Sequence, residues 1–538
     1  MTVIDNGLSE RSDSRKYFRT IESVGTAAIR ILSGMAIAVL LAGSWSMTVV
    51  LDESEHLYVL PDSIIKHLLL FATLIVLFFC LEKVKCLQQI RRLFENNRLY
   101  FLLLVMLITA SACIAVLQVG PQPAADQTMV SDVAVQILNG DLSSFTTGEY
   151  MDRYPHQKGI VVIFSLIYSF VGQNNYSAIE FINLLALIIA CILMLQLAPP
   201  GQVRNYTLMG LLLFIPMWSY TIFVYGTILG FMFSLLSIWS LKKFHCNRQF
   251  RLLILCVFAA FIATICKSNY LIFAVAVIIL LLAEIFIEHR YQAMTAVILL
   301  MFLFVSKENI LNHAIYSLSG TYDVRVEKTI GVPSLGWVVM GLQDDGSRAE
   351  GWFNGYTWYL YIDSNYDPEL MDEELREDLQ ERIVAFTEDP SYAARFFLRK
   401  TLTQWCEPTF QGIWILEVAD SGNTYNPLYE FIVGYQSDGP CFRNFMIEFM
   451  NIFQSVIYLG AFLYVLFYEN KRGIFPLWGI ITFLGGFLFH LFWEAKGEYT
   501  WVYFVLLIPY ATEGIAAFTE RCVQQYDSLE NKKCFEKL

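Results

Sequence analysis

The residues best suited to chemistry lie in an acid-rich stretch, 121–159, which follows an apolar run long enough to cross a bilayer. Its carboxylates are Asp126, Asp132, Asp141, Glu149 and Asp152. A carboxylate held at a membrane face and shielded by helices has a raised pKa and can act as a general base. We favour Asp126, because two nearby prolines expose the loop around it. Asp132 and Glu149 compete for this role, and a solvated loop acid is the alternative.

The acid-rich stretch ends in Tyr154-Pro155-His156-Gln157, directly before a short apolar run. His156 and Gln157 carry donors and acceptors that suit sugar hydroxyls or a phosphate. The alternative is an interfacial helix cap with Tyr154 as its aromatic anchor.

Charged residues at the ends of apolar runs form a second group of candidates. Lys267 interrupts the apolar sequence 251–287. Charge near a membrane is costly enough that it usually marks a ligand or a partner, so we expect this ammonium to hold a phosphate. A lysine that snorkels to the membrane surface is the alternative. A later loop between two apolar runs carries Glu494, Lys496, Glu498 and Tyr499. This loop could bind an anionic head group or neutralise its own charges.

The composition indicates a membrane protein around these residues. Of the 538 residues, 56% are hydrophobic and 16% are charged, whereas soluble domains carry about 25% charged residues. The sequence has no Walker loop, HExxH, paired CxxC or dinucleotide glycine motif, which disfavours an ATP-driven pump. It has no basic patch with interleaved aromatic residues that would predict nucleic-acid binding. A divalent metal site is possible but not indicated.

We therefore predict an all-α polytopic membrane protein with about twelve transmembrane helices and a mixed external loop domain. The predicted spans are 26–48, 64–81, 98–118, 178–197, 205–222, 226–241, 251–266, 269–287, 291–306, 446–467, 474–493 and 499–517. With this count, the short basic loops and both termini fall on one side, which the positive-inside rule makes cytoplasmic. The apolar run 159–172 is too short to span, and we expect an interfacial or re-entrant helix on the outer face.

Four regions follow from these spans. They are a cytoplasmic tail with two extra transmembrane helices (1–97), a transmembrane core with a first external loop at 119–177 (98–306), an external soluble domain (307–445), and the C-terminal transmembrane helices with a cytoplasmic tail (446–538). The external domain contains a helical pattern that ends at Pro390. Cys406 and Cys441 of this domain could pair.

The order of these features resembles the first external loop of GT-C glycosyltransferases. The resemblance rests on an external acid soon after a span (Asp126), then Tyr-Pro-His-Gln, then a short apolar helix. The bacterial members that use lipid-linked arabinose or mannose are the nearest comparison. Lys267 resembles the phosphate-binding lysine of many members, and FWEAKGEYTWVYFVLLIPYA resembles their helix start with a glutamate and a tyrosine. The resemblance covers roughly 98–310 and 446–517. The chain departs from the family where two acids are frequent, because Gln127 follows Asp126.

The resemblance implies a cell-membrane enzyme that transfers a hexose or pentose from a polyprenyl-phosphate carrier to a glycan or lipid acceptor of the cell envelope, outside the cytoplasm. Asp126 would deprotonate the acceptor hydroxyl. Lys267 and Lys496 would neutralise the carrier phosphate as it leaves, where transition-state charge develops. The residues expected to bind or orient donor or acceptor are Tyr154, His156, Gln157, Glu494 and Tyr499. The external domain would cover the site.

Aromatic residues of the external domain could stack on sugar rings or pack its core; they are Trp337, Trp352, Tyr356, Trp358 and Trp405. Two other functions remain open. One is a polysaccharide polymerase or ligase, and the other is a transporter or flippase of lipid-linked glycans. A transporter often has internal repeats, whereas this sequence has none and its polar candidates gather at one face, which favours the enzyme.

Overall fold

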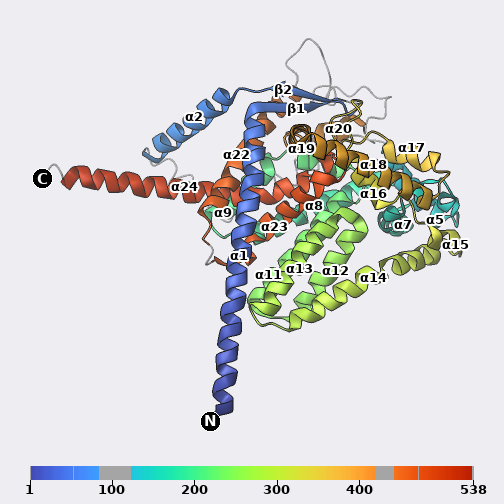
Figure 1. Cartoon of the computed structure of the whole chain (residues 1–538), viewed down its shortest axis with the longest axis horizontal. Helices are drawn as coiled ribbons and strands as arrows, with labels where there is room; N and C mark the ends of the chain where they lie inside the picture. The colour runs from blue at the N-terminus through green and yellow to red at the C-terminus, as the bar shows by residue number, and fades with distance from the viewer. Residues whose placement is uncertain (1, 53, 84–122, 419–441, 470–471, 536–538) are drawn as a thin grey trace.

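A computed structural model describes residues 2–52, 54–83, 123–418, 442–469 and 472–535. The chain is mostly helical, and the single sheet of the described part is a hairpin of β1 (Met47–Leu51) and β2 (Leu57–Pro61). Figure 1 shows the first and last helices extending from the body in different directions. The chain is therefore an all-α membrane protein with very little sheet.

Eight helices of the described part are long and apolar enough to cross a membrane. They lie within α1 (Thr2–Ser46), α8 (Tyr176–Leu197), α11 (Thr227–Asn247), α13 (Leu271–Phe286), α14 (Gln292–Ser319), α22 (Phe442–Phe467), α23 (Trp478–Phe492) and α24 (Trp501–Phe535). Two further apolar helices are shorter, α12 (Phe250–Cys266) and the described apolar part of α2 (Ile64–Lys83). The predicted count of twelve is thus not confirmed.

The predicted span 205–222 differs most clearly, because the structure breaks it into three pieces. They are α9 (Gln202–Leu213), α10 (Pro216–Ser219) and η3 (Tyr220–Ile222). Pro216 cannot continue the preceding helix, since it lacks the N–H and its ring clashes with the previous turn, but it suits the first position of a new helix. The predicted span 98–118 lies outside the described residues.

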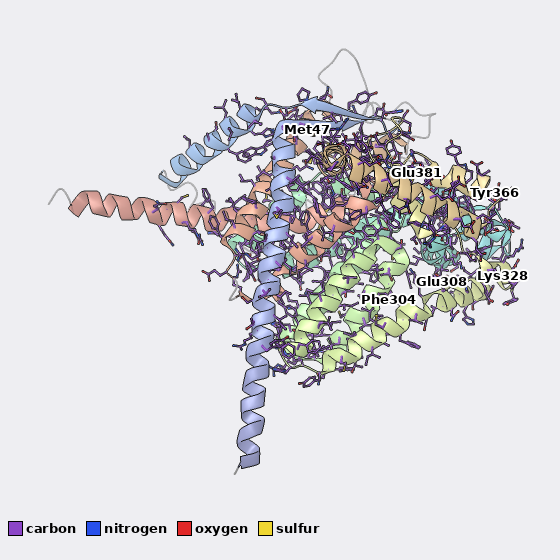
Figure 2. All side chains as sticks on the ribbon, viewed as in Figure 1. Met47, Phe304, Glu308, Lys328, Tyr366 and Glu381 are labelled. Atoms are coloured by element: carbon purple, nitrogen blue, oxygen red, sulfur yellow. The ribbon has the colours of Figure 1, made fainter. Side chains whose placement is uncertain are left out.

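The short apolar run before residue 172 forms α7 (Lys158–Val171), a helix of 14 residues. It packs against α5 (Asp126–Leu138), α12 and α14. The buried Lys158 ammonium donates to the Val326 carbonyl at 2.8 Å and lies 3.3 Å from Glu308 of α14; Figure 2 labels Glu308. α7 is not among the helices long enough to cross a membrane, which agrees with the prediction that this apolar run is too short to span.

The segment after α14 is helical and forms α15 (Val324–Lys328), α16 (Ser334–Met340), α17 (Tyr356–Asp363), α18 (Pro368–Glu388), α19 (Pro390–Trp405) and α20 (Gly412–Val418). Figure 1 shows α15 to α18 at the end of the molecule where α5 and α7 lie. α18 is the helix that the sequence predicts, and Pro390 begins the next one, capped by Asp389. α14 continues to Ser319, past the predicted domain boundary at 306.

This segment joins the bundle through its backbone as well as its side chains. Val332 N donates to Arg153 O at 3.1 Å, and Glu494 N donates to Trp337 O at 3.1 Å. A small core of its own surrounds Met371 and Leu375, whereas Trp405 belongs to the main core. This segment is therefore fastened to the same end of the bundle that carries the predicted site.

Candidate active site

Two interrupted helices position the lysines of the candidate site. Lys267 follows α12 with extended backbone and precedes η4 (Ser268–Tyr270). Lys496 comes after the end of α23, also with extended backbone, and precedes η7 (Gly497–Tyr499). Each break thus has the order lysine, one 3₁₀ turn ending in tyrosine, then a new α-helix. Because each lysine has extended backbone between two helices, its side chain does not follow the regular spacing of side chains on either helix.

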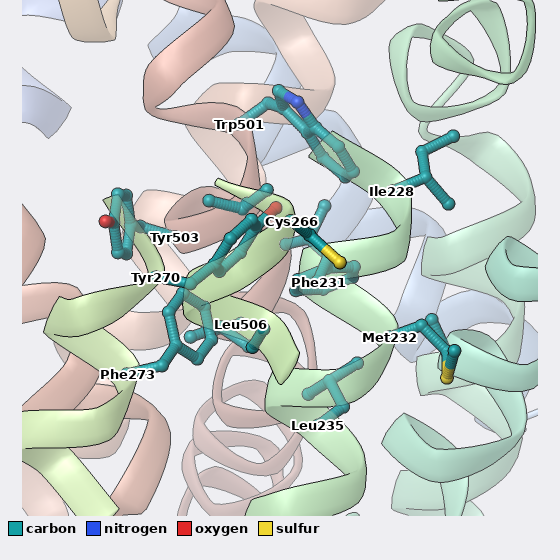
Figure 3. Close-up of a cluster of buried hydrophobic side chains, with 14 of the residues drawn as sticks. Ile228, Phe231, Met232, Leu235, Cys266, Tyr270, Phe273, Trp501, Tyr503 and Leu506 are labelled. Atoms are coloured by element: carbon teal, nitrogen blue, oxygen red, sulfur yellow. The ribbon is translucent and has the colours of Figure 1, made fainter. Parts of the chain in front are cut away.

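Close backbone packing holds the first break in place. A Cβ on Gly226 would lie 1.9 Å from the Cys266 carbonyl oxygen, and one on Gly159 would lie 2.1 Å from the Ile265 carbonyl oxygen. Neither position can hold a side chain, so α7 and the start of α11 press on the end of α12. Figure 3 shows Tyr270 and Phe273 facing Tyr503 beneath this break; the Phe273 and Tyr503 ring centroids are 5.6 Å apart.

Lys267 points from the first break toward the second. Its ammonium lies 3.8 Å from Glu498 Oε1, and 4.9 Å from the ring centroid of Tyr499. It also lies 5.1 Å from the ring centroid of Tyr225 and donates to Thr227 Oγ1 at 3.4 Å. Burial lowers the pKa of Lys267, although neighbouring acids oppose this. The charge is therefore held by long contacts that leave it available to an anion.

Lys496 is paired more closely. Its ammonium lies 3.2 Å from Glu55 Oε1, in the hairpin between β1 and β2, and Gln411 Nε2 donates to the same oxygen at 3.2 Å. Burial is the largest single influence and opposes the charge, but the surrounding acids together, led by Glu55 and Glu498, raise the pKa of Lys496. Gln411 Oε1 also accepts from Glu498 N at 2.9 Å. This network fastens the hairpin to the second break.

Asp126 begins α5 and faces both breaks. Its side chain is solvent-accessible, yet surrounding protein raises its pKa by desolvation. Lys496 and Lys267 lower this pKa, and Glu498 raises it. The nearby Tyr150 hydroxyl also lowers the pKa of Asp126. Among the described residues, this buried hydroxyl has no hydrogen bond of good geometry. A carboxylate with a raised pKa beside two ammonium groups can take a proton from a hydroxyl.

The other acids of the stretch lie apart from the lysines. Asp132 is exposed. Asp152 accepts from Gly148 N at 2.8 Å and from the Tyr361 hydroxyl at 3.0 Å, so it serves a local turn. Glu149 is the N-cap residue of α6 (Tyr150–Arg153). The candidates for the general base are Asp126, Asp132 and Glu149, and the geometry favours Asp126.

The Tyr-Pro-His-Gln sequence forms one wall of the candidate site. The Tyr154 and His156 rings lie 6.0 and 6.2 Å from the Trp337 ring of α16. Burial raises the pKa of Tyr154 to about 12. His156 is solvent-accessible, yet desolvation by the surrounding protein lowers its pKa to about 4, so both rings are uncharged at pH 7. Gln157 Nε2 donates to the Tyr225 hydroxyl, beside Lys267. Neutral rings near a carboxylate offer stacking and hydrogen bonding to a sugar.

Glu494 completes the acidic side of the candidate site. It is 2% exposed, and burial raises its pKa to about 8, so it carries a proton at neutral pH. Its neighbour Lys400 donates to the carbonyls of Gly341 and Trp493, and burial lowers its pKa to about 7. The structure thus brings together all eight predicted residues: Asp126, Tyr154, His156, Gln157, Lys267, Glu494, Lys496 and Tyr499.

Sequence patterns alone did not identify several members of this cluster, namely Glu55, Tyr225, Lys400 and Gln411. Glu55 is the hardest to foresee, because its partner Lys496 lies 441 positions along the chain. The available signal was topology, since the predicted spans place Lys496 and the acidic loop 52–63, which contains Glu55, on the same outer side. Tyr225 gave no signal, because a tyrosine between apolar runs resembles an ordinary core residue.

The remaining predicted features have mixed outcomes. Trp352 and Trp405 are buried, so they pack cores, whereas Trp337 borders the candidate site. The Arg153 guanidinium carbon lies over the Trp358 ring, 3.0 Å from the centroid of that ring. Cys406 is a buried free thiol 3.6 Å from the Leu40 carbonyl, and its suggested partner Cys441 lies outside the described residues.

Within the described ranges, no group of three or more histidine, cysteine, aspartate or glutamate residues is arranged to hold a metal ion. Comparison of the chain with protein-family models, curated proteins and solved structures found no match. The functional argument therefore rests on the geometry of the cluster.

Proposed function

We propose that the protein is a membrane glycosyltransferase of the GT-C type, which transfers a sugar from a polyprenyl-phosphate carrier to a cell-envelope acceptor outside the cytoplasm. One observation carries the proposal: a carboxylate with a raised pKa, Asp126, shares a protein-lined cluster with the lightly paired ammonium of Lys267. A base for a hydroxyl and a cation for a leaving phosphate are the two charged groups that this reaction needs.

In the proposed reaction, Asp126 accepts the proton of the acceptor hydroxyl. The acceptor oxygen forms a bond to the anomeric carbon of the sugar. The bond from that carbon to the carrier phosphate breaks, and the phosphate oxygen keeps the electron pair. Lys267 stabilises the charge that develops on this oxygen. The lipid carrier explains why the enzyme lies in a membrane, and its activated sugar explains why the sequence lacks a nucleotide-binding loop.

The neutral groups around Asp126 support the binding of a sugar. Tyr154, His156 and Trp337 form an aromatic wall, and Tyr499 lies across the Lys267 ammonium. Aromatic faces and uncharged donors suit the apolar faces and hydroxyls of a pyranose or furanose ring. The protonated form of Glu494 would add a donor from the opposite side.

The test replaces the base in the chromosomal copy and compares envelope glycans by mass spectrometry. Asp126→Asn should abolish the sugar decoration, with protein amount and thermal stability retained. The raised pKa means that ionised Asp126 opposes folding at neutral pH, so a neutral amide does not weaken the fold. Asp132→Asn is the matched control and should keep the decoration.

Unchanged glycans in the Asp126→Asn strain would contradict the proposal. Shortened chains in that strain would indicate a polymerase instead of a transferase. Accumulation of carrier-linked precursor in the cytoplasmic leaflet, with no loss of transfer in isolated membranes, would indicate a flippase.

A further inference from the structure

A cavity lies at the opposite end of the helix bundle from Asp126 and the two lysines. It has a volume of about 310 Å³ and is lined by residues of α8, α11, α23 and α24, among others. α11 links the two places: Thr227 contacts Lys267 at its start, and Lys242 and His245 line the cavity near its end. The 18 residues from Thr227 to His245 correspond to about 27 Å of helix. The cavity is therefore separate from the candidate active site.

The walls of this cavity are mainly apolar. They include Leu197, Ile238, Leu280, Trp478 and Pro509. These side chains belong to segments that are long and apolar enough to span a membrane. A cavity with such walls at the end of a membrane helix bundle suits a hydrocarbon chain better than a soluble metabolite.

Two cations without carboxylate partners among the described residues lie at this end of the bundle: Lys242 lines the cavity, and Arg204 lies beside it. Lys242 donates to the Leu197 carbonyl at 2.7 Å, and Arg204 donates to the Ala198 carbonyl at 3.5 Å. No ion pair of Lys242 or Arg204 occurs among the described residues, and the Arg204 Nε is buried without a hydrogen-bond partner. Because they donate to adjacent carbonyls, the two like charges lie near one another and repel. An anion between them would relieve this repulsion and use the unpaired donors.

The other charged groups around the cavity already neutralise one another. Arg472 lies 2.7 Å from Glu513. His245 and Arg290 both contact the buried Glu284, at 2.5 and 2.7 Å. Among the described lining residues, Lys242 is therefore the cation without a carboxylate partner, and Arg204 lies beside it.

We propose that this cavity binds an anionic phospholipid, with its phosphate between Lys242 and Arg204 and an acyl chain along Leu197, Ile238 and Leu280. Basic pockets between membrane helices recognise lipid phosphates in this way. The site needs both parts of the ligand, because the cations pair with the phosphate and the apolar walls exclude a bare anion. It does not depend on the proposed glycosyl transfer.

The test uses the purified full chain and native mass spectrometry with added lipid. Phosphatidylglycerol should remain bound, and phosphatidylcholine should bind at least about tenfold more weakly. The Lys242→Met and Arg204→Met double variant should lose the preference for phosphatidylglycerol. Lys243→Met is the matched control, because that ammonium lies over the Trp239 ring, 5.6 Å from its centroid, whereas Lys242 and Arg204 donate to the adjacent carbonyls of Leu197 and Ala198. Lys242→Arg keeps the charge and should keep binding.

Equal retention of the two lipids, or an unchanged preference in the double variant, would overturn the proposal. Displacement of phosphatidylglycerol by millimolar inorganic phosphate would show that the cavity recognises a free anion instead of a lipid. A polyprenyl phosphate that outcompetes phosphatidylglycerol would reassign the cavity to the carrier lipid.

Discussion

Lys267 and Lys496 occupy breaks with the same local design but different electrostatic surroundings. Each has extended backbone, then a 3₁₀ turn that ends in a tyrosine, Tyr270 in one and Tyr499 in the other. The closest carboxylate to the Lys267 ammonium lies at 3.8 Å, whereas Lys496 has one at 3.2 Å. Burial lowers the pKa of Lys267, while surrounding acids raise that of Lys496.

The difference separates two uses of a buried cation. A tightly paired lysine fixes neighbouring segments, and its removal strands the partner carboxylate. A loosely paired lysine is costly to keep charged, so it gains most from an added anion. We therefore assign the carrier phosphate to Lys267, and the fastening of the β1–β2 hairpin to Lys496. The following predictions test this division.

The largest expected effect is on catalysis at the first break. Lys267→Met should reduce sugar transfer by about 100- to 1,000-fold, the usual result of removing one group that stabilises transition-state charge. The free energy of unfolding should stay the same or rise, because the substitution removes a buried, weakly compensated charge. The measurements are product formation in isolated membranes and thermal unfolding of the purified chain. Lys328→Met, an exposed lysine on α15, is the control. A destabilised Lys267→Met variant would remove the contrast between the two lysines.

A smaller effect, mainly on stability, is expected at the second break. Lys496→Met should lower the free energy of unfolding by about 3 kcal/mol, because it leaves Glu55 unpaired. Combining it with Glu55→Gln should recover most of this loss, and unfolding in denaturant measures both. If the double variant is as unstable as Lys496→Met alone, the ion pair does not hold the hairpin.

The smallest expected effect is a displacement of the pH profile. Transfer needs ionised Asp126, so activity should fall as pH falls through the raised pKa, which lies above the value of about 4 that is usual for aspartate. Both lysines lower this pKa, and Lys496 does so more strongly. The pH at which activity falls on the acidic side should therefore be higher in Lys267→Met than in the wild type. It should be higher still in the double variant that carries Glu55→Gln and Lys496→Met. The same pH in all three proteins would exclude Asp126 as the titrating group.

The sequence predicted those features whose causes are local. Helix α18 follows from its periodicity and flanking prolines, and α7 from the length of an apolar run. Lys267 was identifiable because charge within an apolar sequence needs a physical reason. The break at Pro216 was missed, since apolar residues continue on both sides and hide the effect of one proline.

Features that depend on distant pairing could not be predicted. Glu55 has a partner in the last quarter of the chain, and no pattern near either residue encodes that pair. The likeness of the two breaks is a backbone property, visible only when Lys267 and Lys496 are both found in extended conformation. Their unequal pairing requires the positions of side chains from several elements.

Binding of the carrier lipid tests the division between the two lysines most directly. The measurement titrates polyprenyl phosphate, the proposed product, onto the purified full chain in lipid nanodiscs. Lys267→Met should weaken binding by at least about tenfold, the value of one lost charge-assisted contact, and the Glu55→Gln and Lys496→Met double variant should bind within a few-fold of the wild type. Equal affinity in the wild type and Lys267→Met, or a greater loss in the double variant, would contradict the account.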